Sequence, residues 1–598
     1  MNYMKPIPAE EIPIGPEWMY EIKYDGFRAM LTIQQGGTVT LITKNKHDFT
    51  EKFPEIVRCC SELLEVLRPF LPLKLDGELV VLNHDKQANF ALIQKRGRLK
   101  NKEKIEKASL ERPAAFLAFD LLETGGKSFH DERYSERKAA LENIFQDVHH
   151  PVLQYVEAYK NAEEITKAVF AAKGEGIIAK RKESKYIPGK NHRDWFKIKN
   201  WRTVDGFLTA YEPKNGYFTV AVYEGKQIRE LGSCKHGLDS QTYDTVREVF
   251  LQQGEKRQGY YVLPPAICAR VQTLDLYEGE LREPNFHSIL PEAAPEEFTY
   301  EKVLFDMAMI PEEIEVSNAD KIFWPVPKWT KQDLLIYLRE IAPYMLPFLQ
   351  NRLLTVIRCP DGVEGESFFQ KHLPDYAPEF LEGIGTGDEK HIVCNELRPL
   401  VWLGNHGAIE YHVPFATVES PYPSEIVFDL DPPGREEFPV AVFAARLLKQ
   451  LLDHLELTSF VKTSGNKGMQ VYIPIPPGSM TYEDTGVFTQ GIAWTMEEAH
   501  PDLFTTERMK KKRNGKLYID YVQHGEGKTI IAPYSPRKTK EGTVAAPLFW
   551  EEVQENLRPE QFTIRNVVER VKTFGCPFRD YFVVQKKQHL QKVLDFIK

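Results

Sequence analysis

Through residues 1–200, short apolar runs that alternate with polar positions are separated by brief helical patterns. Alternation over a few residues is typical of β-strands, and Gly36–Gly37 lies between two such runs as a hairpin turn would. The expected strands are MYEIKYDGFRAMLTIQ, TVTLITKN, LPLKLDGELVVL, AAFLAFDLLE and GIIAKR. The pattern therefore predicts a mixed α/β domain.

Residues 201–290 carry few helical signals. The runs GFLTAYEP and YFTVAVYE flank an Asn215–Gly216 turn, and AICARVQTLDLYEG follows them, which predicts a small antiparallel barrel or sandwich. Residues 291–313 are rich in Pro, Ala and Glu and have no clear period, so we expect a linker there.

Residues 314–598 combine helical and strand patterns and are predicted to form a second α/β domain. A helix begins where Thr330 can cap through Asp333, and a second helix is expected after Pro433. The expected buried positions are Leu334, Leu338, Ile341 and Met345 in the first helix and Val440, Phe443, Leu447, Leu451 and Leu455 in the second. The expected strands are LLTVIRCP, EIVFDLDPP, MQVYIPI, LYIDYVQ and TIIAPYS.

The length of 598 residues exceeds the roughly 250–300 residues that one hydrophobic core supports, in agreement with several domains. Hydrophobic residues make up 42% and charged residues 27%, which excludes disordered, collagen-like and membrane proteins. No apolar run approaches about 18 residues and the start lacks a signal-peptide pattern, so we expect a cytoplasmic protein without a membrane partner. The net charge of -9 argues against a protein that coats nucleic acid through bulk electrostatics.

The segment KYDGFR places Lys23 at the end of an expected strand, and charge interrupts further apolar strands downstream. Several such interruptions in a fixed order are hard to explain by packing. An aromatic ring within the set offers a flat face for a base. The set comprises Lys23, Glu78 in LDGELVV, Phe119 in FDLL, Glu175 in EGIIAKR, and Lys197 and Lys199 in WFKIK.

Covalent nucleotidyl transfer requires such a set. Lys23 has to lose its proton before it attacks an α-phosphate, and neighbouring cations or burial lower a lysine pKa. Lys197, Lys199 and a metal ion are the expected cations, which would also neutralise charge on the transferred group. Glu78 and Glu175 are expected to hold a divalent metal ion.

The order of these motifs resembles the covalent nucleotidyltransferases, and specifically the ATP-dependent DNA ligases, over residues 1–290. The resemblance implies an ATP-grasp-like ligase domain over 1–200 and an OB-fold domain over 201–290 that closes over nicked DNA. AMP would pass from a lysine to a 5′-phosphate and be displaced by a 3′-hydroxyl. The implied roles are lysyl-AMP formation for Lys23, ribose contacts for Arg28 and Glu78, adenine stacking for Phe119, metal binding for Glu175, and α-phosphate contacts for Lys197 and Lys199.

One position near this set departs from the ligase pattern, and one further stretch is similar to it. Where such ligases have SRNG, this chain has TKNK, so Lys44 replaces an arginine and offers a point charge instead of a bidentate fork. The stretch LREPNF, with Arg282, is similar to the end of the barrel in one bacterial ligase subfamily.

The segment FDLDPP places Asp429 and Asp431 two residues apart on an expected strand, and therefore on one face. Two such carboxylates repel unless a cation lies between them, which suits Mg²⁺ or Mn²⁺ holding a triphosphate. Asp520 in LYIDY is the expected third carboxylate. In VKTSGNKG, the turn with Ser464 and Lys467 is expected to contact phosphates.

These C-terminal segments resemble the RRM-like primase-polymerase domain of the archaeo-eukaryotic primase class, in the form found in bacterial DNA ligase D. Where that family has histidine in SGGKGLH, this chain has Gln470, which can donate a hydrogen bond but cannot be a cation. The resemblance implies metal binding by Asp429, Asp431 and Asp520, nucleotide binding by Lys371, His412, Ser464, Lys467, Gln470 and Arg537, and a grip on a DNA 5′-phosphate by Lys321 and Lys331.

The joined halves resemble ligase D of the Bacillus type, which implies an enzyme that fills gaps and seals breaks in non-homologous end joining. The resemblance further implies ATP, NTP or dNTP and Mg²⁺ or Mn²⁺, DNA ends with a 5′-phosphate, the end-binding protein Ku, and a monomer associated with the nucleoid. One alternative keeps the ligase but makes the C-terminal half a non-catalytic DNA-end binding module. Another is an RNA ligase or capping-type guanylyltransferase, because these enzymes share the KxDG chemistry.

Overall fold

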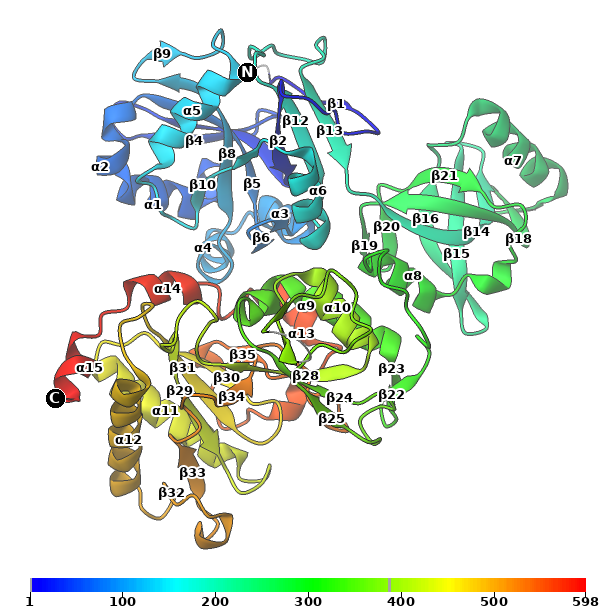
Figure 1. Ribbon diagram of the computed structural model, residues 1–598. Coiled ribbons are helices and arrows are strands. Elements are labelled where there is room, and N and C mark those ends of the chain that lie inside the picture. Colours follow the sequence, from blue (N-terminus) through cyan, green and yellow to red (C-terminus); the bar gives the residue numbers. More distant parts are fainter. Residues whose placement is uncertain (1–2, 386–388, 598) are drawn as a thin grey trace. The chain divides into compact units, whose positions relative to one another are not determined.

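A computed structural model describes residues 3–385 and 389–597, and the chain divides into two compact units, Met1–Met309 and Ile310–Lys598 (Figure 1). In both units the strands expected from the alternating runs are present. In the first of these runs, MYEIKYDGFRAMLTIQ, a turn at residues 24–26 divides the run into two strands.

Two sheets form the first part of unit one. The first sheet has the order β1-β13-β12-β2-β11, and the second has the order β10-β8-β5-β3-β4 with β9 paired to β8. The main core lies between the second sheet and the helices α1 and α5, with Leu31, Leu75, Ile56 and Leu141 buried in it. The strands are β1 (Ile7–Pro8), β2 (Trp18–Lys23), β3 (Phe27–Ile33), β4 (Val39–Thr43), β5 (Leu73–Val80), β8 (Ala115–Thr124), β9 (Lys127–Ser128), β10 (Leu153–Tyr155), β11 (Ala158–Tyr159), β12 (Gly176–Arg181) and β13 (Trp195–Lys199). The helices are α1 (Pro54–Glu62), α2 (Leu64–Leu67), α3 (Phe90–Arg98), α4 (Lys102–Glu111), α5 (Tyr134–Phe145) and α6 (Ala162–Ala171).

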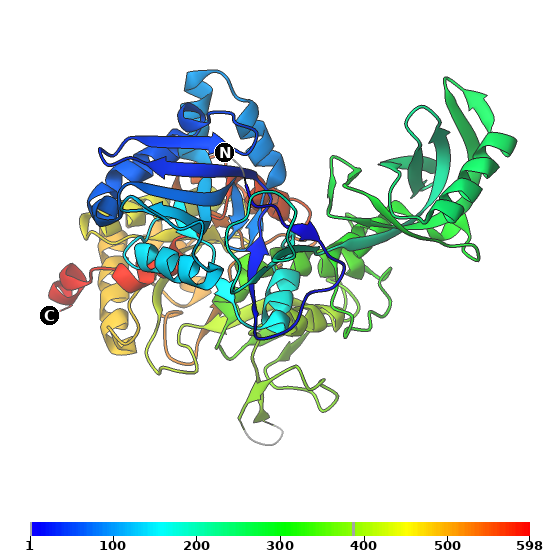
Figure 2. The same ribbon diagram turned by 90° about the horizontal axis from the view of Figure 1, so that it is seen from above.

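One antiparallel sheet with the order β16-β15-β14-β18-β17, and β21 paired to β18, forms the second part of unit one. Bulges interrupt its register at three places, and bulges increase the bend of a sheet, so the strands enclose a core of their own. Helix α7 (Ser240–Gln253) lies against β14 and β18 (Figures 1 and 2). The strands are β14 (Arg202–Glu212), β15 (Tyr217–Glu224), β16 (Gln227–Cys234), β17 (Glu255–Arg257), β18 (Tyr260–Thr273) and β21 (Asn285–Ile289).

The stretch 291–313, expected as a linker, differs from that expectation. It contains helix α8 (Tyr300–Ala308), whose N-cap Thr299 accepts a hydrogen bond from the backbone N–H of Lys302. Val303 and Met307 of α8 are buried in the core of the antiparallel sheet. A helix of nine residues is too short to show a clear period, and its stability comes from this packing.

Unit two is built on two sheets and the helices that cover them (Figure 1). The sheet orders are β25-β24-β28-β34 and β32-β33-β29-β31-β30-β35. The strands are β24 (Thr355–Arg358), β25 (Phe368–Gln370), β28 (Ala408–Pro414), β29 (Glu425–Asp431), β30 (Phe460–Thr463), β31 (Met469–Pro474), β32 (Phe504–Thr505), β33 (Leu517–Asp520), β34 (Thr529–Ile531) and β35 (Pro547–Leu548). The helices are α9 (Lys331–Leu349), α10 (Leu397–Asn405), α11 (Phe438–His454), α12 (Tyr482–Ala499), α13 (Val567–Phe574), α14 (Tyr581–Lys587) and α15 (Gln591–Phe596).

Of the two helices expected in this unit, one buries the predicted face and the other does not. Thr330 caps α9 through Asp333, and all four expected positions on its inner face are buried. In α11 the expected face was wrong, because Phe443 is 40% exposed and the buried face carries Ala441, Ala445 and Leu448 instead. The polar residues Arg446, Gln450 and Asp453 mark the outer face of this helix, and Phe443 lies beside them. Small alanines on the opposite side allow the helix to approach the sheet closely.

Among the described residues, no helix combines the length and apolar character that a membrane crossing requires.

Candidate active sites

Strand pairing positions Lys23 in unit one. Lys23 is the last residue of β2 and lies opposite Gly176 of β12, so Glu175 reaches it, and the Lys23 ammonium donates a hydrogen bond to Glu175 Oε1. The glycine of KYDG is required by space, because a Cβ on Gly26 would lie 2.2 Å from the carbonyl oxygen of Leu79. The backbone therefore turns sharply just after the lysine and leaves its amine at the strand end.

Carboxylates, and not cations, dominate the surroundings of Lys23. Burial lowers the pKa of Lys23, but Glu175, Asp25 and Glu78 raise it by more, so the net direction is upward. These carboxylates outweigh the repulsion between Lys23 and Lys197, which lowers the pKa of Lys197. That lysines and a metal ion together lower the pKa of Lys23 stays a prediction. Burial raises the pKa of Glu78 to about 8, and burial together with Glu175 raises the pKa of Asp25 to about 6.

Arg28 and Glu78 lie directly opposite each other on β3 and β5. The Arg28 guanidinium donates two hydrogen bonds to Asp76, at 3.1 and 2.6 Å, and lies 5.2 Å from the centre of the Phe119 ring. Sequence reasoning missed Asp76. The signal was present, since Asp76 stands two residues before Glu78 and therefore on the same face of β5.

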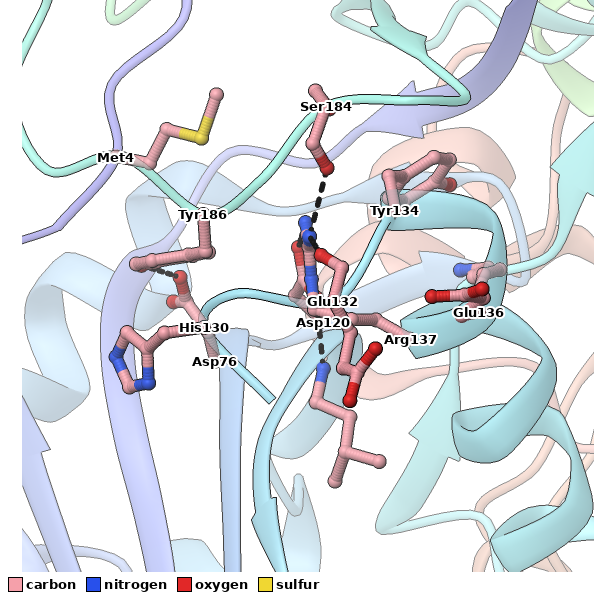
Figure 3. A network of polar contacts seen from close by, with 12 residues as sticks. Met4, Asp76, Asp120, His130, Glu132, Tyr134, Glu136, Arg137, Ser184 and Tyr186 are labelled. Carbon is pink, nitrogen blue, oxygen red and sulfur yellow. Dashed lines mark hydrogen bonds and ion pairs between the residues drawn. The ribbon is translucent and has the colours of Figure 1, made fainter. Parts of the chain in front are cut away.

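A buried network fixes the strand that carries Phe119. Arg137 of α5 donates to both oxygens of Asp120, at 2.7 and 2.9 Å, and to the carbonyl oxygen of Ser184 at 3.0 Å (Figure 3). The Tyr186 hydroxyl donates to Asp76 at 2.6 Å beside it (Figure 3). These contacts join β5, β8 and the segment after β12. One connected network therefore holds both the strand of Phe119 and Asp76, the partner of Arg28.

The remaining cations predicted for unit one are spread around this centre. Lys197 and Lys199 lie on β13, and the pKa of Lys197 is lowered by burial and by the charges of Lys23 and Lys199. Lys199 forms an ion pair with Glu283 at 2.6 Å. Lys44 is exposed, and burial of part of its side chain and the charge of Arg28 lower its pKa. Arg282 forms an ion pair with Asp25, in the KYDG segment itself.

In unit two, the aspartates occupy neighbouring strands. Asp429 of β29 is the direct partner of Asp520 of β33, and Asp431 follows two residues later. Phe428 contacts Phe488 of α12, so the face of β29 that alternates with the aspartates is covered by a helix. Burial and the charges of Asp431 and Asp520 raise the pKa of Asp429 to about 6.

The carboxylate pair fits a divalent cation chemically, because directly opposed carboxylates repel each other unless a positive charge lies between them. Asp431 is already neutralised by Lys467 at 2.8 Å and Arg513 at 3.2 Å. Across residues 3–385 and 389–597, no group of three or more His, Cys, Asp or Glu side chains is arranged to hold a metal ion. Asp431 would have to exchange these cations to join Asp429 and Asp520 as a ligand.

Part of the glycine turn after β30 is hydrogen-bonded to other protein groups. Ser464 Oγ accepts hydrogen bonds from the backbone N–H groups of Asn466 at 3.3 Å and Gly468 at 3.1 Å. Lys467 donates to the carbonyl oxygen of Pro432 at 2.7 Å as well as pairing with Asp431. The turn is therefore held beside the aspartates, but two of its N–H groups have protein partners.

Two of the expected nucleotide-binding residues share one buried carboxylate that sequence reasoning missed. Glu410 lies 3.0 Å from His412 Nε2 and 3.4 Å from Arg537 Nε, and it accepts a hydrogen bond from the backbone N–H of Lys538 at 2.8 Å. These partners lower the pKa of Glu410 although burial raises it. Lys371 is exposed after β25, and in the described part of the chain it donates no hydrogen bond to the other expected nucleotide ligands.

Gln470 is buried and links Asp429 to a second residue that sequence reasoning missed, Lys462. Sequence spacing alone offered no signal for Lys462, since a lysine just before a turn is usually exposed.

The two lysines expected to grip a 5′-phosphate differ in exposure. Lys321 is half-buried and pairs with Asp361 at 2.5 Å. Lys331 is buried, and its ammonium donates to Asn405 Oδ1 at 2.9 Å. Burial and the charge of Lys321 lower the pKa of Lys331. Lys331 therefore joins the start of α9 to the end of α10, and Lys321 is the more accessible of the two.

Comparisons with known proteins agree with both halves. The family described as "ATP dependent DNA ligase domain" matches residues 9–199, and the family described as "LigD, primase-polymerase domain" matches residues 330–578. The chain is 42% identical over its whole length to the bifunctional non-homologous end joining protein LigD of Bacillus subtilis, of which it covers 99%. The chain belongs to the LigD family.

A second LigD, the multifunctional protein of Pseudomonas aeruginosa, is 26% identical over 96% of this chain and 71% of its own length. Membership of the LigD family makes the chain a DNA ligase that uses ATP, joined to a polymerase domain. The match of unit two to a primase-polymerase family argues against the alternative of a non-catalytic end-binding module. The match of unit one to a DNA ligase family likewise disfavours an RNA ligase or a guanylyltransferase.

Proposed function

We propose that the two activities use separate reactive centres, one complete within each unit, and that they act in sequence at a double-strand break. The second unit fills a gap from a nucleoside triphosphate, and the first unit then seals the remaining nick. The observation that supports this division is that the carboxylates that raise the pKa of Lys23 belong to unit one, whereas Asp429 and Asp520 are strand neighbours within unit two.

In unit one, the neutral amine of Lys23 forms a bond to the α-phosphorus of ATP while pyrophosphate leaves. Glu175, which accepts the hydrogen bond of the Lys23 ammonium, is the group in contact to take up its proton. A divalent ion held by Glu175 and Glu78 would neutralise the carboxylates that raise the lysine pKa. Arg28 and Glu78 are proposed to hold the ribose, Phe119 the adenine, and Lys44, Lys197 and Lys199 the phosphates.

In unit two, Asp429, Asp431 and Asp520 are the proposed ligands of Mg²⁺ or Mn²⁺, which would supply charge stabilisation for the transferred phosphoryl group. His412 and Arg537, both anchored by Glu410, are proposed to bind the triphosphate together with Lys371, Ser464, Lys467 and Gln470. Lys321 and Lys331 are the proposed contacts for a DNA 5′-phosphate.

We further propose Ku as the partner that delivers DNA ends, a monomeric enzyme, and a cytoplasmic location at the nucleoid. The experiment that tests the whole scheme is a joining assay on gapped, 5′-phosphorylated DNA with nucleotides supplied or withheld. We expect joining only when nucleotides are present. Joining of the gapped substrate without nucleotides would contradict the proposed order of events.

A further inference from the structure

Four side chains form one row across the central strands of unit two. Lys462 of β30 pairs with Gln470 of β31, Gln470 pairs with Asp429 of β29, and Asp429 pairs with Asp520 of β33. Because cross-strand partners point to the same face of a sheet, the row runs from a lysine to the proposed metal ligands.

The hydrogen bonds along this row have a fixed direction. The Lys462 ammonium donates to Gln470 Oε1 at 2.5 Å, and Gln470 Nε2 donates to Asp429 Oδ1 at 3.1 Å. An amide can point either way in a site, but a lysine has three donors and no acceptor. With a lysine donor on one side and a carboxylate acceptor on the other, the Gln470 oxygen points to Lys462 and its N–H₂ group points to Asp429.

Packing alone does not account for Lys462. Its side chain has no exposed surface, it forms no ion pair among the described residues, and its nearest ring, Tyr472, lies 5.7 Å away. Burial and the charge of Arg537 lower the pKa of Lys462, whereas Asp429 raises it. Burying a lysine without a directly paired carboxylate is costly, and an apolar side chain would fill the same space at a lower cost.

We propose that Lys462 is a positioning residue of the polymerase centre, which orients the Gln470 amide so that Asp429 keeps the geometry needed to bind a divalent cation. The inference rests on the proposed function of the aspartates. Gln470 cannot carry a charge itself, and the lysine on the next strand strengthens its hydrogen bond to the carboxylate.

The test compares the full-length wild type with Lys462→Met, which keeps the stem and removes the donor, and with Lys462→Arg, which keeps a cationic donor. Mn²⁺ binding is measured by electron paramagnetic resonance without nucleotide, and extension is measured as kcat and KM. We expect Lys462→Met to weaken Mn²⁺ binding about 10- to 100-fold, as for other residues that orient metal ligands. We expect Lys462→Arg to restore most of that loss, and the exposed Lys587→Met to bind Mn²⁺ like the wild type.

A double variant tests whether Lys462 affects Mn²⁺ binding by way of Gln470. If Lys462 acts through Gln470, adding Gln470→Leu to Lys462→Met causes little further loss of Mn²⁺ binding. Equal Mn²⁺ binding by Lys462→Met and the wild type would overturn the inference, as would a full additional loss in the double variant. If Lys462→Met does not fold, Gln470→Glu decides: we expect weaker Mn²⁺ binding from a carboxylate against Asp429, and unchanged or tighter binding overturns the inference.

The same series separates this inference from the proposed function. If Asp429→Asn loses Mn²⁺ binding and extension while Lys462→Met retains both, only the role of Lys462 fails. If Asp429→Asn retains both, the proposed function of the aspartates fails first.

Discussion

In unit one the proposed reactive group is a cation surrounded by carboxylates, whereas in unit two the proposed metal ligands are carboxylates that face each other across neighbouring strands. The pKa of Lys23 is raised by Glu175, and the pKa of Asp429 is raised by burial and by Asp431 and Asp520. The first centre therefore rests with its nucleophile protonated and charge-balanced. In the second, Asp429 and Asp520 repel each other across neighbouring strands, although Asp431 is paired with Lys467 and Arg513. The two centres therefore require different events before they react.

The sharpest test of this contrast is Lys23→Ala. We expect it to remove lysyl-AMP formation below detection, a loss of at least about 10⁴-fold for the removal of a nucleophile. Gap filling should be unchanged, because the aspartates belong to the other unit. Intact mass after incubation with ATP and Mg²⁺ measures the first effect, and primer extension measures the second. Loss of both activities in a folded variant would argue against two separate centres.

Asp429→Asn should lower the extension activity and raise the stability of the metal-free protein. We expect extension to fall about 10³-fold, because several kcal/mol of metal stabilisation are lost. Without metal the variant should be more stable than the wild type at pH 7.5, since Asp429, with a pKa of about 6, is ionised there against its neighbours. Extension and thermal unfolding in EDTA measure the two effects, with the exposed Asp453→Asn as control. A less stable variant in EDTA would show that the aspartates do not repel.

Glu410→Gln tests whether the nucleotide ligands of unit two depend on one carboxylate. We expect the KM for the incoming nucleotide to rise about 10- to 100-fold, the size expected for a hydrogen bond to a charged group, with a smaller change in kcat. The exposed Glu436→Gln is the matched control. An unchanged KM would mean that His412 and Arg537 hold their positions without Glu410.

Glu78→Gln tests the buried carboxylates of unit one through the pH dependence of stability. The folded chain keeps the Glu78 proton up to about pH 8, whereas an unfolded chain releases it near 4.5, so wild-type stability falls as the pH rises between these values. The variant lacks this loss, so its Tm should exceed that of the wild type at pH 8.5 by about 2–4 °C for each kcal/mol relieved, and match it below pH 4.5. Scanning calorimetry at both pH values, with Glu103→Gln as control, measures the sign of this Tm difference.

The smallest effect is expected for Lys321→Ala. An exposed charge contributes about 0.2–1 kcal/mol, so binding to a 5′-phosphorylated DNA end should weaken about two- to fivefold, with no change for a 5′-hydroxyl end. Fluorescence anisotropy with matched oligonucleotides measures the difference. Equal weakening on both ends would make Lys321 part of the general electrostatic surface.

Much of the fold and of both centres could be predicted from local patterns. Alternation predicted the strands, and the capping signal at Thr330 predicted the start of α9. The face of α11 was predicted wrongly, because the large apolar residues did not mark the buried side, whereas Arg446, Gln450 and Asp453 marked the exposed side. The charges around Lys23 could not be summed from the sequence, because the balance of burial, carboxylates and cations depends on distances that a sequence does not contain.

By itself, the order of residues determined which candidate side chains share a face, since the residue two positions from Asp429 shares its face in any strand, and a glycine after KYD permits one sharp turn. Only the tertiary structure decided their partners. Asp76 became the anchor of Arg28, Glu410 the anchor of His412, and Lys462 the neighbour of Gln470 through pairing between strands distant along the chain. The physical reason is that register between such strands is a long-range property, selected by the packing of whole sheets.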